Sequence, residues 1–267
     1  MPLSLPSAVD LRGRTAVVSG AGSPTGIGMA CARLLAGCGA DVVVTATTDR
    51  VLERAAEIGA LGVRSAGVAA DLTDEDGAAR VVAAALDLTG RLDVLVNNAG
   101  MVSVSDPEMG EGDLLGTDPA RWAASLARNL DTTYHLTRAA LPHLRVAGGG
   151  RVVVVTSATG AVMAMRREVA YATAKAGLVG LVRALAVDEG PHGVTVNAVA
   201  PGWIATGSQT PAEAGEGLTT PLGRSGTAEE VASAVGWLAS PGAGYVTGQV
   251  VVVDGGNSVA EERATGS

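Results

Sequence analysis

The chain has 267 residues, enough for one large α/β domain, and no Pro/Gly/Ser-rich linker or charge block divides it. Hydrophobic residues make up 47% of the chain and Phe is absent, so the expected core is built from Ala, Val and Leu. The 19 basic and 27 acidic side chains give a net charge of −8, which argues against a nucleic acid or an anionic membrane surface as partner.

The N-terminal segment MPLSLPSAVD has no basic stretch before an apolar run, and no run of 18 uncharged apolar residues follows. We therefore expect a cytoplasmic protein that acts on a small molecule and not at a membrane. Cys31 and Cys38 lie seven residues apart on one expected helix, and we interpret them as small buried residues in a reducing compartment. They do not resemble a metal site, and no metal is expected.

Short Val-rich runs alternate with longer helical segments along the chain. The runs are continuously apolar, which indicates strands buried on both faces. These runs lie at 15–19, 41–45, 63–69, 93–97, 151–156, 194–200 and 250–254. Helices are expected near 26–38, 49–60, 73–89, 119–146, 170–189 and 227–239. The alternation predicts a single-domain, Rossmann-type α/β fold, a doubly wound parallel sheet of about seven strands with helices on both faces.

The stretch SGAGSPTGIG, at 19–28, separates the first expected strand from the first expected helix. Glycines in this setting hold a dinucleotide pyrophosphate on a helix N-terminus. The spacing fits neither G-x-G-x-x-G nor, counted from Gly20, G-x-x-x-G-x-G. Taken alone, the stretch is therefore either a cofactor loop or a glycine-rich turn.

In a parallel sheet, ligands bind beyond the carboxyl ends of the strands. Small and polar residues gather at these places: 20–28, 46–50, Asp71, 98–100, Ser157, 201–202 and 254–256. A ligand lying across the sheet edge explains this set more economically than seven unrelated turns. Each member taken singly is also explained by a helix cap or a turn.

The segment YATAK places Tyr171 and Lys175 four residues apart in an expected helix, hence on one face. A free tyrosine has a pKa of about 10, so it works as an acid-base at neutral pH only when a nearby cation favours its phenolate. Lys175 would supply that cation. By itself the pair is a weak signal, because tyrosine and lysine at this spacing more often form an ordinary solvated helix face.

Several motifs follow one another in a specific order: TGIG, NNAG, VTSATG, YATAK, NAVAPG and VDGG. With this order and spacing the chain resembles the short-chain dehydrogenases/reductases from about Leu11 to Gly256. The resemblance implies an NAD(P)-dependent oxidoreductase that transfers a hydride between nicotinamide and a carbonyl or secondary-alcohol carbon. It implies one domain over 1–267, with its core at about 11–256 and a substrate loop at about 203–226.

The resemblance also implies roles for single residues. Tyr171 would be the general acid-base, while Lys175 would lower its pKa and hold the nicotinamide ribose. Ser157 would hydrogen-bond the substrate oxygen, and Asn129 would anchor a water that links Lys175 to solvent. The implied cofactor-binding residues are Gly20, Ser23, Thr25, Gly26, Ile27, Gly28, Thr47, Thr48, Asp71, Leu72, Asn98, Ala99, Gly100, Tyr171, Lys175, Pro201, Gly202, Ile204 and Thr206. The residues expected near the substrate, from loop position, are Met101, Val102, Ala158, Met163 and Trp203.

The glycine loop departs from the family pattern T-G-x-x-x-G-x-G. After Ser19-Gly20 there are five residues, AGSPT, where three are expected. Lengthened loops of this kind occur in the enoyl reductase branch, but that branch separates its tyrosine and lysine by more than four residues. The spacing of Tyr171 and Lys175 therefore favours the carbonyl-reducing branch.

Cofactor choice is usually decided at the end of the second strand, where an acidic residue binds the ribose hydroxyls of NAD and repels a 2′-phosphate. This chain has Ala46 near that position, which favours NADP(H), with Thr47, Thr48 and Arg50 near the phosphate. The glycine loop lacks a basic residue and Asp49 is close, so NAD(H) remains the alternative.

The expected substrate is a small free ketone or alcohol. The main alternative is a 3-oxoacyl-acyl-carrier-protein reductase, which the acidic insertion SDPEMGEGD at 105–113 disfavours because it would repel an acidic carrier. A third reading is a non-catalytic dinucleotide-binding regulator. The long segments 119–146 and 170–189 imply, by resemblance, a homotetramer or a homodimer.

Overall fold

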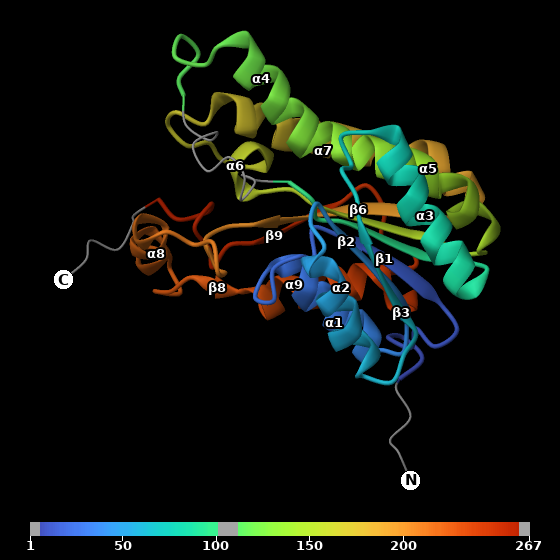
Figure 1. The fold of residues 1–267 in the computed structure, drawn as a ribbon. Helices are drawn as coiled ribbons and strands as arrows, with labels where there is room; N and C mark the ends of the chain where they lie inside the picture. Colours follow the sequence, from blue (N-terminus) through green and yellow to red (C-terminus); the bar gives the residue numbers. More distant parts are fainter. Residues whose placement is uncertain (1–5, 101–111, 262–267) are drawn as a thin grey trace.

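The computed structural model describes residues 6–100 and 112–261. Its centre is a parallel sheet with the strand order β3-β2-β1-β4-β5-β6-β9 (Figure 1). The strands are β1 (Thr15–Ser19), β2 (Asp41–Ala46), β3 (Ser65–Ala69), β4 (Val94–Asn97), β5 (Arg151–Val155), β6 (Thr195–Pro201) and β9 (Val250–Val253). The order reverses between β1 and β4, as in a doubly wound nucleotide-binding sheet, so the predicted fold class is confirmed.

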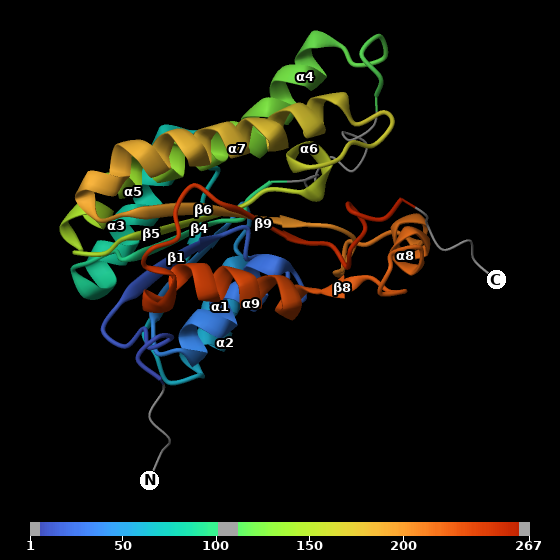
Figure 2. The same ribbon diagram turned by 180° about the vertical axis from the view of Figure 1, so that it is seen from behind.

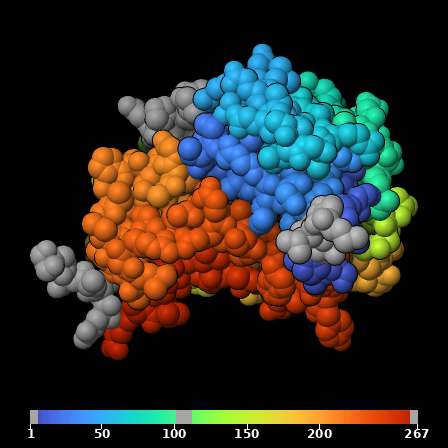
Figure 3. Space-filling view, turned by 90° about the horizontal axis from the view of Figure 1, so that it is seen from below, coloured from blue at the N-terminus to red at the C-terminus, as the bar shows by residue number. Residues whose placement is uncertain are grey.

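Helices cover both faces of the sheet (Figures 1 and 2). One layer consists of α1 (Ile27–Gly37), α2 (Arg50–Gly59) and α9 (Ala228–Ala239). The other consists of α3 (Glu75–Thr89), α5 (Thr132–Val146) and α7 (Val169–Glu189). In the view from below, the blue surface of the first part of the chain adjoins the orange to red surface of its last part, in keeping with the packing of α1 against α9 (Figure 3).

The continuous valine runs are explained by these two layers. Val18 and Val44 are buried in the core under α1, α2 and α9, while Val17 and Val43 are buried in the core under α3, α5 and α7. Because successive side chains of a strand point to opposite faces, a strand covered on both faces needs apolar residues at every position.

Several element boundaries differ from those expected. The helix expected from 73 begins at Glu75, because the Asp74 side chain caps it by accepting a hydrogen bond from the Asp76 N–H. The helix expected over 119–146 is divided into α4 (Pro119–Leu126), a π-helical turn at Ala127–Asp131, and α5. Elements that were not expected are the short α6 (Ala158–Ala161), α8 (Pro211–Leu218), the strand pair β7 (Ile204–Ala205) and β8 (Gly226–Thr227), and 3-10 turns at Gly190–His192 and Pro241–Ala243.

One helical segment of the described residues, Val169–His192, is long and apolar enough to cross a membrane by length and composition alone. It contains α7, which lies on the sheet with Leu178 and Val182 buried in the core. A helix that covers a sheet in this way needs an apolar face for packing, which accounts for its composition.

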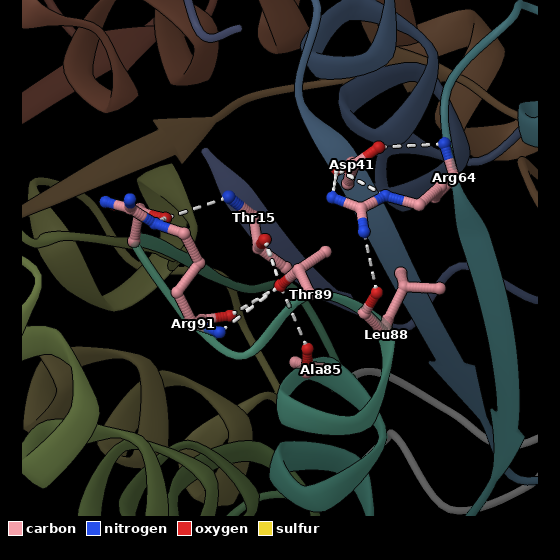
Figure 4. Close-up of polar contacts among 8 residues, drawn as sticks. Thr15, Asp41, Arg64, Ala85, Leu88, Thr89 and Arg91 are labelled. Atoms are coloured by element: carbon pink, nitrogen blue, oxygen red, sulfur yellow. Dashed lines mark hydrogen bonds and ion pairs between the residues drawn. The ribbon is translucent and has the colours of Figure 1, made fainter. Parts of the chain in front are cut away.

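The amino-terminal edge of the sheet is tied together by polar side chains (Figure 4). The buried carboxylate of Asp93 accepts hydrogen bonds from the Thr15 N–H, at 2.9 Å, and from Arg91 Nε, at 2.8 Å. The hydroxyls of Thr15 and Thr89 lie 2.6 Å apart. Asp93 therefore links the start of β1 to the connection between α3 and β4.

We expect Asp93→Ala to lower the free energy of unfolding by about 3 kcal/mol, because it leaves the buried Thr15 N–H without its acceptor. Urea denaturation followed by circular dichroism measures the change. The control is Glu53→Ala, which removes an exposed partner of Arg54 and should cost no more than about 0.5 kcal/mol. Equal losses in the two variants would contradict this role of Asp93.

Candidate active site

The candidate site lies at the carboxyl edge of the sheet, where β1 and β4 separate. Asn98, directly after β4, donates from Nδ2 to the carbonyl oxygens of Ser19 and Gly20, each at 3.1 Å. In return the Ser19 hydroxyl accepts hydrogen bonds from the backbone N–H groups of Asn98 and Ala99, each at 3.0 Å. These bonds attach the start of the glycine loop to the end of β4.

The glycine loop is packed too closely for side chains at two positions. A Cβ on Gly20, whose φ is +67°, would lie 2.7 Å from Asn98 Nδ2, and one on Gly28 would lie 2.5 Å from the Gly20 oxygen. Helix α1 then begins with Gly26 as N-cap, without a side-chain cap and without an acidic residue in its first turn. Its first N–H groups are therefore available to an anion, which fits the pyrophosphate of a dinucleotide.

Tyr171 and Lys175 lie together on α7. Lys175 Nζ is 5.6 Å from the centroid of the Tyr171 ring and donates to the Val155 oxygen at 3.4 Å. A Cβ on Gly100 would lie 3.1 Å from both Lys175 Nζ and Asn129 Oδ1, so Asn129 and Lys175 flank Gly100. Ser157 lies close enough to the Tyr171 hydroxyl to lower its pKa. The structure thus brings the four expected catalytic residues together.

Ser157 is held close to α7 by the turn that follows it. Its hydroxyl accepts a hydrogen bond from the Thr159 N–H at 3.2 Å, which caps α6. Gly160 has a φ of +93°, and a Cβ there would lie 2.4 Å from the Ala172 oxygen. Only glycine allows α6 to pack this closely against α7, and this packing places Ser157, the N-cap of α6, next to Tyr171.

Asn129 is presented by the π-helical turn between α4 and α5. It is buried, and its Nδ2 donates to the Ser125 oxygen at 3.1 Å. π-helical turns occur mostly as single turns inside α-helices, and frequently at functional sites. The sequence predicted one continuous helix here, because no glycine or proline within Ala127–Asp131 marks a break.

Burial has the largest effect on the pKa values of Tyr171 and Lys175. It raises the pKa of Tyr171 to about 12. The Ser157 hydroxyl reduces this rise, and the carboxylates of Glu168 and Glu213 increase it. Burial also lowers the pKa of Lys175 from 10.5 to about 8. In the free chain Tyr171 is therefore a neutral proton donor, and the lowering of its pKa by Lys175 stays a prediction for the cofactor-bound state.

Beyond β2, the residues expected at the 2′-phosphate are exposed. Thr47, Thr48 and Arg50 all lie on the surface, and Arg50 Nε donates to the Thr48 hydroxyl at 3.3 Å. At the adenine end, Asp71 is exposed and accepts from the N–H and hydroxyl of Thr73, each bond under 3 Å, so it forms a local turn and not the cap of α3.

The remaining cofactor residues lie at strand ends of the same edge. Leu72 follows β3 and is buried, and Ala99 is part-buried after β4. Pro201 ends β6 and Gly202 follows it, close to Asp254. Ile204 lies in β7 and Thr206 follows, and its hydroxyl is 3.0 Å from that of Ser208.

The structure describes three of the five residues expected near the substrate. Met101 and Val102 lie outside the described residues. Met163 and Trp203 are part-buried, whereas Ala158 is 2% exposed. The sequence interpretation missed Asn257, whose Nδ2 lies 3.7 Å from the Met163 sulfur, and Glu213, which acts on Tyr171 from α8. Neither residue belongs to one of the sequence motifs. Glu213 lies on α8 and Asn257 follows β9, both far in sequence from Tyr171 and Met163.

Within residues 6–100 and 112–261, no group of three or more His, Cys, Asp or Glu side chains is placed to hold a metal ion. Both cysteines are free, and burial raises the pKa of the Cys31 thiol to about 12.

Comparison with known proteins assigns the family. A family model described as enoyl-(acyl carrier protein) reductase matches residues 20–258. The chain belongs to the short-chain dehydrogenase/reductase family. Among curated members of this family, a 3-oxoacyl-(acyl-carrier-protein) reductase of Pseudomonas aeruginosa is 39% identical over 253 residues, covering 93% of this chain and 98% of the relative.

Two further short-chain dehydrogenases/reductases illustrate the range of substrates. A cis-4-hydroxycyclohexanecarboxylate dehydrogenase of Sinomonas cyclohexanicum is 39% identical over 247 residues, covering 91% of this chain and 96% of the relative. A solved 7α-hydroxysteroid dehydrogenase, in complex with NADH and 7-oxo glycochenodeoxycholic acid, is 31% identical with a TM-score of 0.86. That likeness covers 96% of this chain and 98% of the solved chain.

The lowered pKa of Lys175 predicts how stability varies with pH. Below about pH 8 the folded chain holds a buried cation, which costs free energy, and this cost disappears as the pH rises from about 8 to 10.5. We expect Lys175→Met to be more stable than the natural chain by about 2 kcal/mol at pH 7, with the difference vanishing towards pH 10.5. Urea unfolding across this pH range measures it, and a variant less stable at pH 7 would contradict the prediction.

Proposed function

We propose that the chain is an NADP(H)-dependent oxidoreductase that transfers a hydride between nicotinamide and the carbonyl or secondary-alcohol carbon of a small molecule. The observation that carries the proposal is the cluster of Asn129, Ser157, Tyr171 and Lys175 beside the glycine loop. In this proposal residues 11–256 form the dinucleotide-binding core, and 203–226 form the substrate loop.

Tyr171 is the proton donor in the direction of reduction. Its phenol is neutral in the free chain, so its O–H proton passes to the carbonyl oxygen as that oxygen gains negative charge. Ser157 hydrogen-bonds the same oxygen and orients it towards Tyr171. The bound nicotinamide supplies the hydride to the carbonyl carbon, or accepts it in the reverse direction.

Lys175 and Asn129 restore the proton to Tyr171. The Lys175 ammonium, held at the Val155 oxygen, stabilises the phenolate that remains after proton transfer. Asn129 lies beside Lys175 near Gly100, where it anchors the water that connects the ammonium to solvent. In alcohol oxidation the same groups work in reverse, and Tyr171 takes up the proton.

The preference for NADP(H) rests on the end of β2. The usual acidic position is occupied by Ala46, while the Thr47 and Thr48 hydroxyls and the Arg50 guanidinium are exposed beside it and suit a 2′-phosphate. Asp49 is exposed next to them, and its carboxylate opposes this preference. NAD(H) is therefore the alternative cofactor.

Two substrate classes compete. The identity to the Pseudomonas aeruginosa reductase supports a 3-oxoacyl substrate bound to a carrier protein. The carboxylates of Glu168 and Glu213 near Tyr171 favour the other class, a small free ketone or alcohol, because an acidic carrier protein would be repelled. The acidic stretch at 105–113 adds to that repulsion in sequence, although most of it lies outside the described residues.

A homotetramer or homodimer is part of the proposal. The outer faces of α5 and α7 form a groove of about 310 Å³, lined among others by Tyr134, Leu141, Leu181 and Leu185. An apolar groove between two long helices suits the pairing of two copies across a two-fold axis.

The cytoplasm is the proposed location of the protein. Its two cysteines are both free, which is in keeping with a reducing compartment.

We expect faster turnover with NADPH than with NADH, and turnover of free ketones in preference to 3-oxoacyl esters. A panel of ketones, secondary alcohols and 3-oxoacyl esters, including carrier-bound ones, assayed with both cofactors by nicotinamide absorbance, measures both preferences. A clear preference for NADH would contradict the proposal that Ala46 at the end of β2 favours NADP(H). Activity on acyl esters alone would favour the alternative function, a 3-oxoacyl-carrier-protein reductase.

We expect Tyr171→Phe to lower kcat by about a thousandfold or more, because the proton donor is lost. NADPH binding, followed by fluorescence, should change little, since the ring and Lys175 remain. The matched control is Tyr245→Phe on a fully exposed tyrosine, which should keep full activity. If Tyr171→Phe left cellular function unchanged, the non-catalytic regulator would become the better reading.

A further inference from the structure

The lengthened glycine loop contacts the substrate loop directly. The Thr25 hydroxyl oxygen accepts a hydrogen bond from the backbone N–H of Gly207 at 3.1 Å, between residues 182 positions apart in sequence. Thr25 is the last of the five residues that replace the usual three, so the contact involves the very segment in which this chain departs from its family.

Gly207 is shaped for this contact. A Cβ on Gly207 would lie 2.7 Å from the Thr25 hydroxyl oxygen and 3.9 Å from that of Ser23. A side chain at position 207 would therefore push the Thr25 hydroxyl away, whereas glycine lets that hydroxyl reach the backbone N–H.

The other side of the glycine loop is anchored to the helical layer. Arg33 of α1 donates from Nη1 to the Pro24 oxygen at 2.8 Å, and its Nη2 pairs with Glu57 of α2 at 3.0 Å. The Gly26 N–H closes the turn by donating to the Ser23 oxygen at 3.3 Å. Arg33 thus attaches the glycine loop to α1 and α2, while Thr25 attaches it to the substrate loop.

The contact lies where a bound dinucleotide would be enclosed. Thr25 directly precedes Gly26 and Ile27, at the uncapped N-terminus of α1 that suits the pyrophosphate. Gly207 directly follows Thr206, in the segment that follows β6 at the same sheet edge. A bond between these two segments therefore joins the two sides of the proposed cofactor site.

We propose that Thr25 is a clasp that fastens the substrate loop to the glycine loop across the dinucleotide pyrophosphate and so prolongs the stay of the cofactor. The inference rests on the proposed function. Thr25 acts here as a positioning residue: its oxygen holds Gly207, and its hydroxyl proton remains available to a phosphate oxygen.

The first test uses the chain without cofactor. We expect Thr25→Val to speed hydrogen exchange at the Gly207 amide about three- to tenfold. This factor corresponds to the net free energy of one hydrogen bond. Thr25→Ser keeps the hydroxyl and should exchange like the natural chain. The matched control is Thr219→Val, which removes another hydroxyl of the substrate loop, bonded to the Glu216 oxygen, and should leave Gly207 unchanged.

The second test measures how fast NADPH leaves the protein, by stopped-flow nicotinamide fluorescence without substrate. We expect Thr25→Val to raise the dissociation rate by about the same three- to tenfold factor, and Thr25→Ser and Thr219→Val to leave it unchanged. Gly207→Ala, which crowds the hydroxyl from the other side, should act in the same direction as Thr25→Val.

The outcomes separate the clasp from the proposed function. Unchanged exchange in Thr25→Val, or fast exchange in Thr25→Ser as well, would overturn the clasp even if the enzyme is active. Altered exchange with an unaltered NADPH dissociation rate would overturn its role in cofactor retention. A natural chain that binds neither NADPH nor NADH would overturn the proposed function and that role together, while the exchange data would still report on the bond itself.

Discussion

The close approach of backbone to backbone where β1 and β4 separate is the constraint on which the rest of the site depends. Asn98 ties the ends of both strands together, and Gly20 and Gly28 leave no space for a Cβ between them. Because this packing turns the chain directly into α1, the helix N-terminus is presented uncapped at the sheet edge. The other residues proposed to bind the cofactor lie along the same edge.

The second feature of the site is the balance between stability and reactivity at Lys175. The ammonium is 3% exposed, and its one hydrogen bond to Val155 is long. Burial of a cation with so little compensation costs folding free energy, yet it keeps the charge beside Tyr171 poorly screened by water. The free chain holds Tyr171 neutral, so below about pH 8 Lys175 carries the charge of this pair.

Much of the fold and of the site was predictable from sequence because it depends on local chemistry. Continuous valine runs indicate strands covered on both faces, and glycine, asparagine and serine at strand ends indicate a ligand edge. The pair Tyr171 and Lys175 is local to one helix. The π turn at Asn129 was not predicted, because the segment Ala127–Asp131 contains no glycine or proline that would mark a change in the helix.

The sequence by itself determined the family, the order of the strands along the chain and the identity of the four central side chains, since motif order and spacing are properties of the linear chain. The tertiary structure alone decided which distant segments meet. Glu213 acts on Tyr171, and Thr25 meets Gly207, only because the 203–226 segment folds back over the sheet edge. Such contacts are set by the path of a long loop, and no local propensity records that path.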